Sequence, residues 1–345
     1  MKAMVMAAGI GTRLRPLTYA FPKPMLPVVN KPVIEHMLHL LERYGIREIV
    51  INLHYQPKVI KNYLKTGEQM GMEINYSYEE RIKGTAGGVK RASKYFKETF
   101  IVVSGDGVTD IDLAKAIAFH KKRKALATIV LSPVDAKFPY GIVLTRANGL
   151  INRFIEKPKW GDVFHNWVNT GIYILEPEIF RFIPASLEFD FGHQLFPKLV
   201  KMGKGVYGYK ASGYWCDIGD LHEYRRVHSD ILEEKVGLRI PGEKLGRKIW
   251  VGKGTFIDKR AKLKGPLVIG EGCHIEKNTS LSEYTVLGNQ SVVKKGARLR
   301  RCIVWDKAFI AKNVELRDCI IGLSANVQEN ISVFAGSVLN VSKRH

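Results

Sequence analysis

Hydrophobic residues in the first 235 positions follow two alternating periods. Short apolar or alternating runs, typical of strands, lie at 3–7, 48–53, 73–78, 100–104 and 126–131. Apolar residues at helical spacing predict helices at 33–44, 57–64 and 112–122. Further short runs, at 142–145, 151–155 and 171–175, suit an inserted sheet that holds a second substrate. The alternation predicts an α/β fold, with a Rossmann-like, mostly parallel sheet and flanking helices.

After Gly237 a different period takes over. An apolar residue recurs every six positions at Val251, Ile257, Leu263, Ile269, Ile275, Leu281, Leu287, Val293 and Leu299. The register then shifts twice, to Val304, Ile310 and Leu316 and again to Ile321, Val327, Val333 and Leu339. This period fits no helix and no simple strand, but it is typical of a left-handed parallel β-helix, in which each hexapeptide forms one face of a coil. We therefore expect two domains, at 1–236 and 237–345.

Composition supports a globular chain of this size. The 345 residues are 46% hydrophobic and 25% charged, which suffices for two cores. No apolar run is long enough to span a bilayer, and Arg13 and Arg15 interrupt the first one too early for a signal peptide. The four cysteines are scattered along the chain, at Cys216, Cys273, Cys302 and Cys319. This spacing predicts a reducing, cytoplasmic location with no disulfide or zinc framework.

Positive charge exceeds negative charge along the whole chain. The formal net charge is +21, and residues 241–345 carry 19 Lys and Arg against 9 Asp and Glu. Nucleic-acid binding would account for such an excess, but no helix-turn-helix, zinc-finger or RNA-binding signature accompanies it. We therefore expect neither a nucleic-acid nor a membrane partner, and anionic small substrates explain part of the charge.

A glycine-containing loop follows the first predicted strand. Its small residues are Ala8, Gly9, Gly11 and Thr12. Backbone N–H groups in such a loop can approach phosphate oxygens, and Arg13 and Lys23 add full positive charges. The loop is not a P-loop, and Leu14 replaces the third glycine of the dinucleotide fingerprint. A tight turn with surface arginines is the alternative interpretation.

A carboxylate stands at the end of a predicted strand. Asp106 follows the strand at 100–104, and a carboxylate at the end of a strand is well placed to bind Mg²⁺. The alternative is an ordinary turn, where aspartate is common. Asp110 is a competing ligand. A second carboxylate, Asp217, is by itself compatible with the N-cap of the next helix.

The segment from Met6 to Pro24 resembles the signature of the sugar-1-phosphate nucleotidyltransferases, and the resemblance continues in ordered motifs over about 240 residues. It implies that residues 1–236 form the catalytic domain. It also implies that Arg13 and Lys23 are catalytic, that the small residues of the loop bind the nucleotide, and that Asp106 and Asp217 bind Mg²⁺. Gly107 departs from the family, which usually has a larger residue there, and this leaves Asp110 open as a ligand.

Other motifs of the resemblance imply the rest of the site. The loop under the nucleobase would be Gly84, Thr85, Ala86 and Gly87. The sugar phosphate would be bound by Gly141, Glu156, Lys157, Asn169 and Thr170. Taken alone, the first motif is also compatible with any turn at the start of a helix. Glu156 and Lys157 are likewise compatible with an exposed ion pair.

The resemblance implies an enzyme that condenses an NTP with a sugar 1-phosphate to give an NDP-sugar and pyrophosphate. Local similarity favours GTP with mannose 1-phosphate, and dTTP or UTP with glucose 1-phosphate is the alternative. A non-catalytic nucleotide-sugar-binding regulatory subunit is less compatible, because Arg13, Lys23, Asp106 and Asp217 are all present. An added acetyltransferase activity would have to use His274, which is more typical of a structural residue. We expect a homo-oligomer formed through the β-helix.

Overall fold

The computed structural model describes residues 1–133, 142–155, 167–185 and 187–338. The chain divides into two compact units. The first, the α/β unit, comprises Met1–Ile10, Pro22–Pro24 and Ile34–Asp217. The second, the β-helix unit, comprises Gly11–Phe21, Met25–Val33 and Ile218–His345. Two short N-terminal segments therefore belong to the same unit as the C-terminal repeats.

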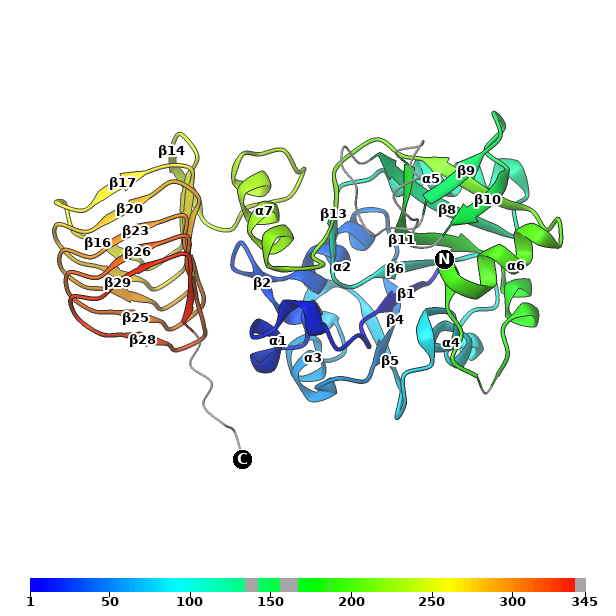
Figure 1. The fold of residues 1–345 in the computed structure, drawn as a ribbon, viewed down its shortest axis with the longest axis horizontal. Helices are drawn as coiled ribbons and strands as arrows, with labels where there is room; N and C mark the ends of the chain where they lie inside the picture. Colours follow the sequence, from blue (N-terminus) through cyan, green and yellow to red (C-terminus); the bar gives the residue numbers. More distant parts are fainter. Residues whose placement is uncertain (134–141, 156–166, 186, 339–345) are drawn as a thin grey trace. The chain divides into compact units, whose positions relative to one another are not determined.

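The α/β unit is built on a nine-stranded sheet, drawn in Figure 1. Its parallel centre has the order β6-β1-β4-β5, formed by β6 (Phe100–Ser104), β1 (Ala3–Met6), β4 (Glu48–Leu53) and β5 (Glu73–Tyr78). Five further strands extend it beyond β6, namely β8 (Ala127–Pro133), β9 (Ile142–Thr145), β10 (Ile151–Ile155), β11 (Trp167–Leu175) and β12 (Val206–Lys210). Because β11 runs antiparallel to β6 and to β8, the sheet is mixed at this edge. The mostly parallel sheet predicted from the sequence is confirmed, and β11 begins four residues earlier than expected.

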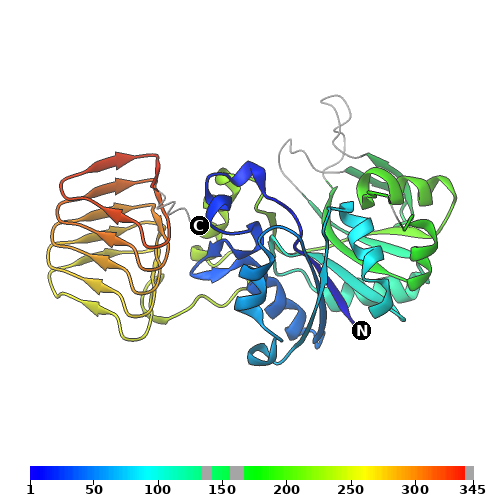
Figure 2. The same ribbon diagram turned by 90° about the horizontal axis from the view of Figure 1, so that it is seen from below.

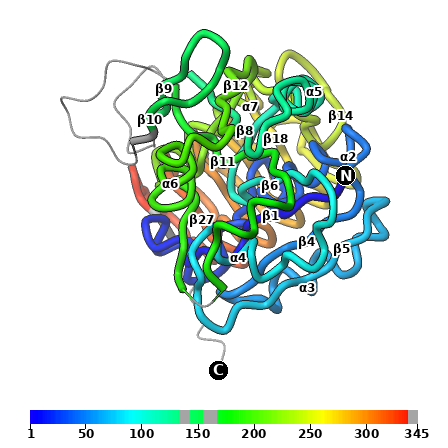
Figure 3. The backbone as a smooth tube through the Cα atoms, turned by 90° about the vertical axis from the view of Figure 1, so that its right-hand side faces the viewer, coloured from blue at the N-terminus to red at the C-terminus, as the bar shows by residue number. Residues whose placement is uncertain are grey.

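Helices cover both faces of this sheet, as Figure 3 shows. On one side lie α2 (Val33–Arg43) and α5 (Leu113–Arg123), and on the other lie α4 (Gly84–Arg91) and α6 (Phe196–Lys201). A further helix, α3 (Pro57–Leu64), connects β4 to β5. Because both faces are covered, strands such as β1 and β6 are apolar almost without interruption and nearly fully buried. Their carboxyl ends are left free to carry polar residues.

The β-helix unit contains three parallel sheets, one on each face of its coils (Figures 1 and 2). The first is β15 (Ile249–Val251), β18 (Leu267–Ile269), β21 (Thr285–Leu287), β24 (Ile303–Val304), β27 (Ile320–Ile321) and β30 (Ser337–Val338), with β14 (Glu243–Gly246) antiparallel at its start. The second is β16 (Phe256–Ile257), β19 (His274–Ile275), β22 (Val292–Val293), β25 (Phe309–Ile310) and β28 (Asn326–Val327). The third is β17 (Lys262–Lys264), β20 (Ser280–Ser282), β23 (Arg298–Arg300), β26 (Glu315–Arg317) and β29 (Ser332–Phe334).

The predicted parallel β-helix is confirmed, and the structure explains the two shifts of its repeat. Leu267 pairs with Thr285, 18 positions later, whereas Val286 pairs with Ile303, 17 positions later. The longer coil turns its corner with two left-handed residues, Glu283 and Tyr284. The next coil has one left-handed residue there, Arg301. Each shift of the hexad register is therefore a corner that lacks one residue.

The β-helix unit also contains α7 (Leu221–Leu232) and, from the N-terminal segments, α1 (Leu17–Ala20) and the β2–β3 hairpin (Pro27–Val28 with Lys31–Pro32). All four cysteines lie in the described part of the chain, and each is buried and outside any disulfide. Within the described residues, none of the helices has the length and apolarity needed to cross a membrane.

Candidate active site

Two short strands bring Asp106 and Asp217 together in the α/β unit. Asp106 follows β6 directly, after Gly105. The next three residues form β7 (Gly107–Thr109), which pairs antiparallel with β13 (Trp215–Asp217). In this register Asp217 lies opposite Gly107, so the two aspartates are neighbours across the ribbon although 111 positions apart.

Lys23 lies between the two carboxylates. Its Nζ is 2.6 Å from Asp106 Oδ2 and 3.1 Å from Asp217 Oδ1. The Ser104 hydroxyl donates a hydrogen bond to the other oxygen of Asp106. The side chain of Lys23 is 11% exposed, and those of Asp106 and Asp217 are 22% and 24% exposed. The three charges are thus mostly shielded from water but remain partly exposed.

The electrostatics of the cluster keep its members charged. Burial alone lowers the pKa of Lys23, but the negative charges of Asp106 and Asp217 outweigh burial and hold that pKa above its ordinary value. Burial alone raises the pKa of Asp106, but the Lys23 ammonium, helped by Ser104, holds it below its ordinary range. At neutral pH the site therefore presents an ammonium between two carboxylates.

The donor set of the cluster fits a hard divalent cation. Oxygens of both carboxylates contact one nitrogen, so both can contact one cation. No group of three or more His, Cys, Asp or Glu side chains suitable for a metal occurs among the described residues. Mg²⁺ needs no such group, because it typically takes one or two carboxylates and completes its shell with phosphate and water oxygens.

Neighbouring residues bear on the alternatives left open by the sequence. Asp110 accepts a hydrogen bond from the Tyr214 N–H at 2.6 Å, so its carboxylate holds the residue that precedes β13. The N-cap of α7 is Asp220, which accepts from the N–H groups of His222 and Glu223 at 2.9 Å. Asp217 is therefore not the cap of that helix.

A buried polar network holds the start of the glycine loop, where Ala8 and Gly9 lie just beyond β1. The Ala7 N–H donates to Asn52 Oδ1 at 2.8 Å, and Asn52 Nδ2 donates to Glu79 Oε1 at 2.6 Å. The other oxygen of Glu79 accepts from the Lys83 N–H at 3.0 Å. Sequence reasoning missed Asn52 and Glu79. A polar residue inside the otherwise apolar run 49–53 and an acid directly after the strand 73–78 were the available signals.

Gly84, Thr85, Ala86 and Gly87 form the first turn of α4. Gly84 has φ 73°, and a Cβ there would lie 2.7 Å from the Phe189 carbonyl oxygen, so only glycine fits. The Thr85 N–H and hydroxyl donate to Asp190 Oδ1, at 2.9 and 2.8 Å, and the Gly87 N–H donates to the Phe189 carbonyl. The chain at 189–190 thus supports this turn, whose role at the nucleobase stays a prediction.

Asn169 and Thr170 lie on β11 in a stretch of irregular pairing. The Thr170 hydroxyl donates to the Val130 carbonyl at 2.8 Å, and Asn169 Nδ2 donates to the Tyr173 hydroxyl at 3.0 Å. The indole N–H of Trp215, next to the metal candidate on β13, donates to the Thr170 carbonyl at 3.0 Å. The predicted sugar strand is thereby joined to the strand of Asp217. The other sugar-phosphate candidates, Gly141, Glu156 and Lys157, lie outside the described residues.

The remaining loop residues belong to the β-helix unit. Gly11 has the left-handed conformation, with φ 69°, and its carbonyl accepts a hydrogen bond from the Thr18 hydroxyl at 2.9 Å. Leu14 is fully buried, whereas Thr12 and Arg13 are exposed. Because Leu14 packs inside while Thr12 and Arg13 are exposed, the hydroxyl and the guanidinium are accessible to a ligand.

Comparison with known proteins identifies the class. Residues 2–234 match the nucleotidyl transferase family, and residues 263–342 match the GMPPB C-terminal domain. The chain belongs to the nucleotidyl transferase family, which confirms the resemblance seen in its motifs.

Two relatives extend this match. A UTP–glucose-1-phosphate uridylyltransferase of Synechocystis sp. is 36% identical over 285 residues, covering 78% of this chain and 74% of the relative. A probable mannose-1-phosphate guanylyltransferase 2 of Oryza sativa subsp. japonica is 33% identical over 347 residues, covering 95% of this chain and 87% of the relative. The latter match therefore includes the β-helix.

A solved structure shares the fold. A putative glucose-1-phosphate thymidylyltransferase from Bacillus anthracis, in complex with sucrose, superposes with a TM-score of 0.62 at 23% identity. The similarity covers 69% of this chain and 97% of that one.

Proposed function

We propose that this enzyme condenses an NTP with a sugar 1-phosphate and releases pyrophosphate and an NDP-sugar. The observation that carries the proposal is the convergence of Asp106, Asp217 and Lys23 at the carboxyl edge of the sheet. In open α/β sheets that edge is where ligands bind. Two acids that share one cation suit a reaction between two phosphate esters, whose main obstacle is negative charge.

In the proposed reaction, an oxygen of the sugar phosphate forms a bond to the α-phosphorus of the NTP. The bond from that phosphorus to the bridging oxygen of the β-phosphate breaks, and pyrophosphate leaves with the electron pair. Because the second pKa of a phosphate monoester is about 6, the nucleophile is largely ionised at neutral pH. The protein therefore has to position two anions and offset their charge rather than remove a proton.

The proposed roles follow from this requirement. Asp106 and Asp217 hold Mg²⁺, which when bound would neutralise charge on the phosphates. Arg13 and Lys23 stabilise charge on the leaving pyrophosphate. Lys157 holds the incoming sugar phosphate. The nucleotide is bound by Ala8, Gly9, Gly11, Thr12 and the first turn of α4, and the sugar phosphate by Gly141, Glu156, Asn169 and Thr170.

GTP with mannose 1-phosphate is the proposed substrate pair. Its support is the local similarity of the sequence motifs and the guanylyltransferase relative that matches along 95% of this chain. The uridylyltransferase relative favours UTP with glucose 1-phosphate as the second candidate.

A grid of pyrophosphate-release assays tests the function. Each of four NTPs is combined with mannose 1-phosphate or glucose 1-phosphate in the presence of Mg²⁺. We expect GTP with mannose 1-phosphate to give the highest kcat/KM, about tenfold or more above the other pairs, because a polar pocket rejects a mismatched base strongly. Preference for UTP with glucose 1-phosphate would replace the substrate assignment, and no release with any pair would refute the function.

We also propose that the β-helix joins copies of the chain. Its last described coil exposes apolar side chains, with Phe334 59% and Ile331 38% exposed, and the end of a β-helix needs a cap. We expect light scattering to show a homo-oligomer at micromolar concentration, and Phe334→Asp to shift it toward monomer. Phe256→Asp is the matched control, because Phe256 is similarly exposed, at 54%, in the first coil. A monomeric wild-type protein would contradict the assignment.

A further inference from the structure

The β-helix unit includes the segments on both sides of Lys23, namely Gly11–Phe21 and Met25–Val33. The first of them carries Gly11, Thr12 and Arg13, three of the residues proposed to act on the NTP. The question is therefore which contacts of the repeat domain fix the conformation of these segments.

One residue interrupts a column of glycines in the β-helix. The positions that follow β15, β18, β21, β24 and β27 are Gly252, Gly270, Gly288, Trp305 and Gly322. Glycine is required where the next coil approaches closely. A Cβ on Gly270 would lie 2.6 Å from the Asn289 nitrogen, and one on Gly288 would lie 2.4 Å from the Trp305 carbonyl carbon. Within the described coils Trp305 is the one large side chain in this column, and its contacts lie outside the regular repeat.

The Trp305 side chain is 2% exposed because residues from outside the repeats cover it. Its ring lies 5.6 Å from the ring of Phe21, the last residue of the first segment. Its indole N–H donates to the Tyr224 hydroxyl at 3.1 Å, and that hydroxyl donates to the Pro27 carbonyl in the second segment at 2.6 Å. Burial raises the pKa of Tyr224, so the hydroxyl keeps its proton and can donate. Trp305 thus contacts one segment directly and the other through Tyr224.

The second segment has a strained turn that needs such support. Val29 and Asn30, at the tip of the β2–β3 hairpin, have φ values of 48° and 64°. A β-branched residue seldom adopts positive φ, and surrounding contacts must hold it there. The Val29 N–H donates to His228 Nδ1 of α7 at 3.4 Å, and Asn30 Nδ2 donates to the Leu287 carbonyl of the β-helix at 2.9 Å.

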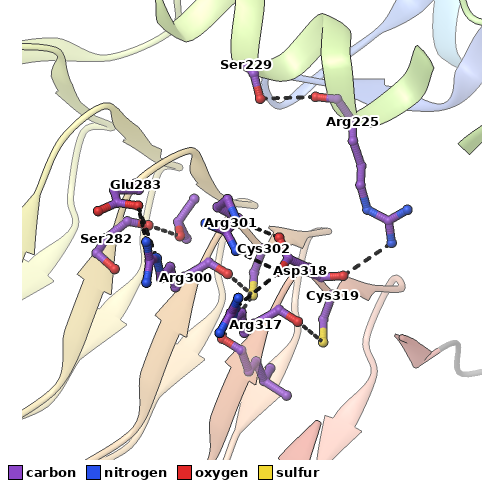
Figure 4. Close-up of polar contacts among 12 residues, drawn as sticks. Arg225, Ser229, Ser282, Glu283, Arg300, Arg301, Cys302, Arg317, Asp318 and Cys319 are labelled. Atoms are coloured by element: carbon purple, nitrogen blue, oxygen red, sulfur yellow. Dashed lines mark hydrogen bonds and ion pairs between the residues drawn. The ribbon is translucent and has the colours of Figure 1, made fainter. Parts of the chain in front are cut away.

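Helix α7, which contributes Tyr224 and His228, is itself attached to the coils. Figure 4 shows the Arg225 side chain extending from α7 to the Asp318 carbonyl, a contact of 3.3 Å. The Asp318 carboxylate accepts in turn from Nε and Nη2 of Arg301, at 2.6 and 2.9 Å, in the preceding coil. At the other end of the helix, the Tyr284 hydroxyl donates to Glu233 at 2.7 Å. Helix α7, which contacts the second segment through Tyr224 and His228, is therefore attached to the coils near both of its ends.

We propose that Trp305 is a positioning residue for NTP binding. It anchors Gly11–Phe21 and Met25–Val33 to the β-helix and so holds the NTP-binding residues in place. The proposal rests on the proposed function, since it assigns the anchored residues to NTP binding. Ordering a flexible segment on binding loses backbone entropy and weakens affinity, and a segment that is already fixed before the ligand binds avoids this loss. Sugar-phosphate binding, assigned to other segments, does not depend on the anchor.

The test compares Trp305→Ala with a variant that damages the β-helix elsewhere. Ile310→Ala is the matched control, because Ile310 is fully buried in the interior of the coils. Both changes remove a large buried side chain and so cost local packing. We expect Trp305→Ala to raise the KM for NTP about tenfold and to leave the KM for sugar 1-phosphate within about twofold, whereas Ile310→Ala changes neither. Trp305→Phe, which keeps a ring beside Phe21, should recover most of the loss.

Hydrogen exchange supplies a readout that does not depend on activity. Amides in 11–33 should exchange on the order of tenfold faster in Trp305→Ala and at the wild-type rate in Ile310→Ala. If Trp305→Ala does not fold, Tyr224→Phe, which removes one hydroxyl, should raise exchange at 27–30 and the KM for NTP about threefold. Equal KM values and equal exchange in the Trp305 and Ile310 variants would overturn the proposal. Faster exchange at 11–33 in a protein that turns over no sugar phosphate would refute the proposed function and leave the anchor standing.

Discussion

Replacing Asp106 or Asp217 with asparagine is expected to lower kcat by on the order of 100-fold or more while the fold stays intact. Each carboxylate contributes one oxygen to the point where Lys23 Nζ now lies. Asparagine keeps the size of the side chain but loses the negative charge that binds a cation. The loss should appear in kcat measured at saturating NTP and sugar 1-phosphate, with Mg²⁺ in excess.

Asp110→Asn is the matched control. Asp110 lies four positions from Asp106, and an asparagine oxygen can still accept the hydrogen bond from the Tyr214 N–H. This variant should retain nearly full activity, whereas a large loss in it would make Asp110 a ligand. Near-normal turnover in both the Asp106 and Asp217 variants would remove the metal assignment. Circular dichroism spectra of all three should match wild type.

The features that could be predicted from the sequence are the local and periodic ones. The hexad from Val251 to Leu299 predicted the β-helix because each inward position must be apolar. Even the shifts at Val304 and Ile321 were visible as missing residues. The two acids of the site could be named because each stands in a short motif beside a strand. That the two acids meet through β7 and β13 could not be predicted, because it depends on a pairing between distant segments.

The contacts that the sequence did not reveal join segments far apart in the chain. Asn52 and Glu79 form one chain of hydrogen bonds only in the folded sheet, where Asn52 accepts from the Ala7 N–H and donates to Glu79. Trp305 is visible as an exception in a glycine column, but its partners Phe21 and Tyr224 follow no repeat. The membership of Gly11–Phe21 in the β-helix unit likewise depends on tertiary packing, which no local period encodes.

Replacing Lys23 with methionine should affect both stability and activity, and Mg²⁺ should separate the two effects. Methionine fills a similar volume without the charge, so Asp106 and Asp217 would face each other with no cation between them. Removing one partner from a fully buried pair costs about 3–5 kcal/mol, and we expect about 2 kcal/mol here because both acids keep roughly a fifth of their surface exposed. The melting temperature in EDTA should therefore fall by several degrees, and kcat should fall on the order of 100-fold with the loss of charge stabilisation.

Adding Mg²⁺ without substrates should then raise the melting temperature of Lys23→Met more than that of wild type. In the variant a cation can bind the two carboxylates without competing with an ammonium, and binding to the folded state alone stabilises it in proportion to the logarithm of ligand concentration. Lys2→Met is the matched control, because Lys2 pairs with Glu48 at the opposite, amino end of β1 and is more exposed. It should lose less than about 0.5 kcal/mol and show the wild-type response to Mg²⁺. Identical Mg²⁺ responses in Lys23→Met and wild type would mean that the metal and the lysine do not share these carboxylates, and the metal site would have to be sought elsewhere in the chain.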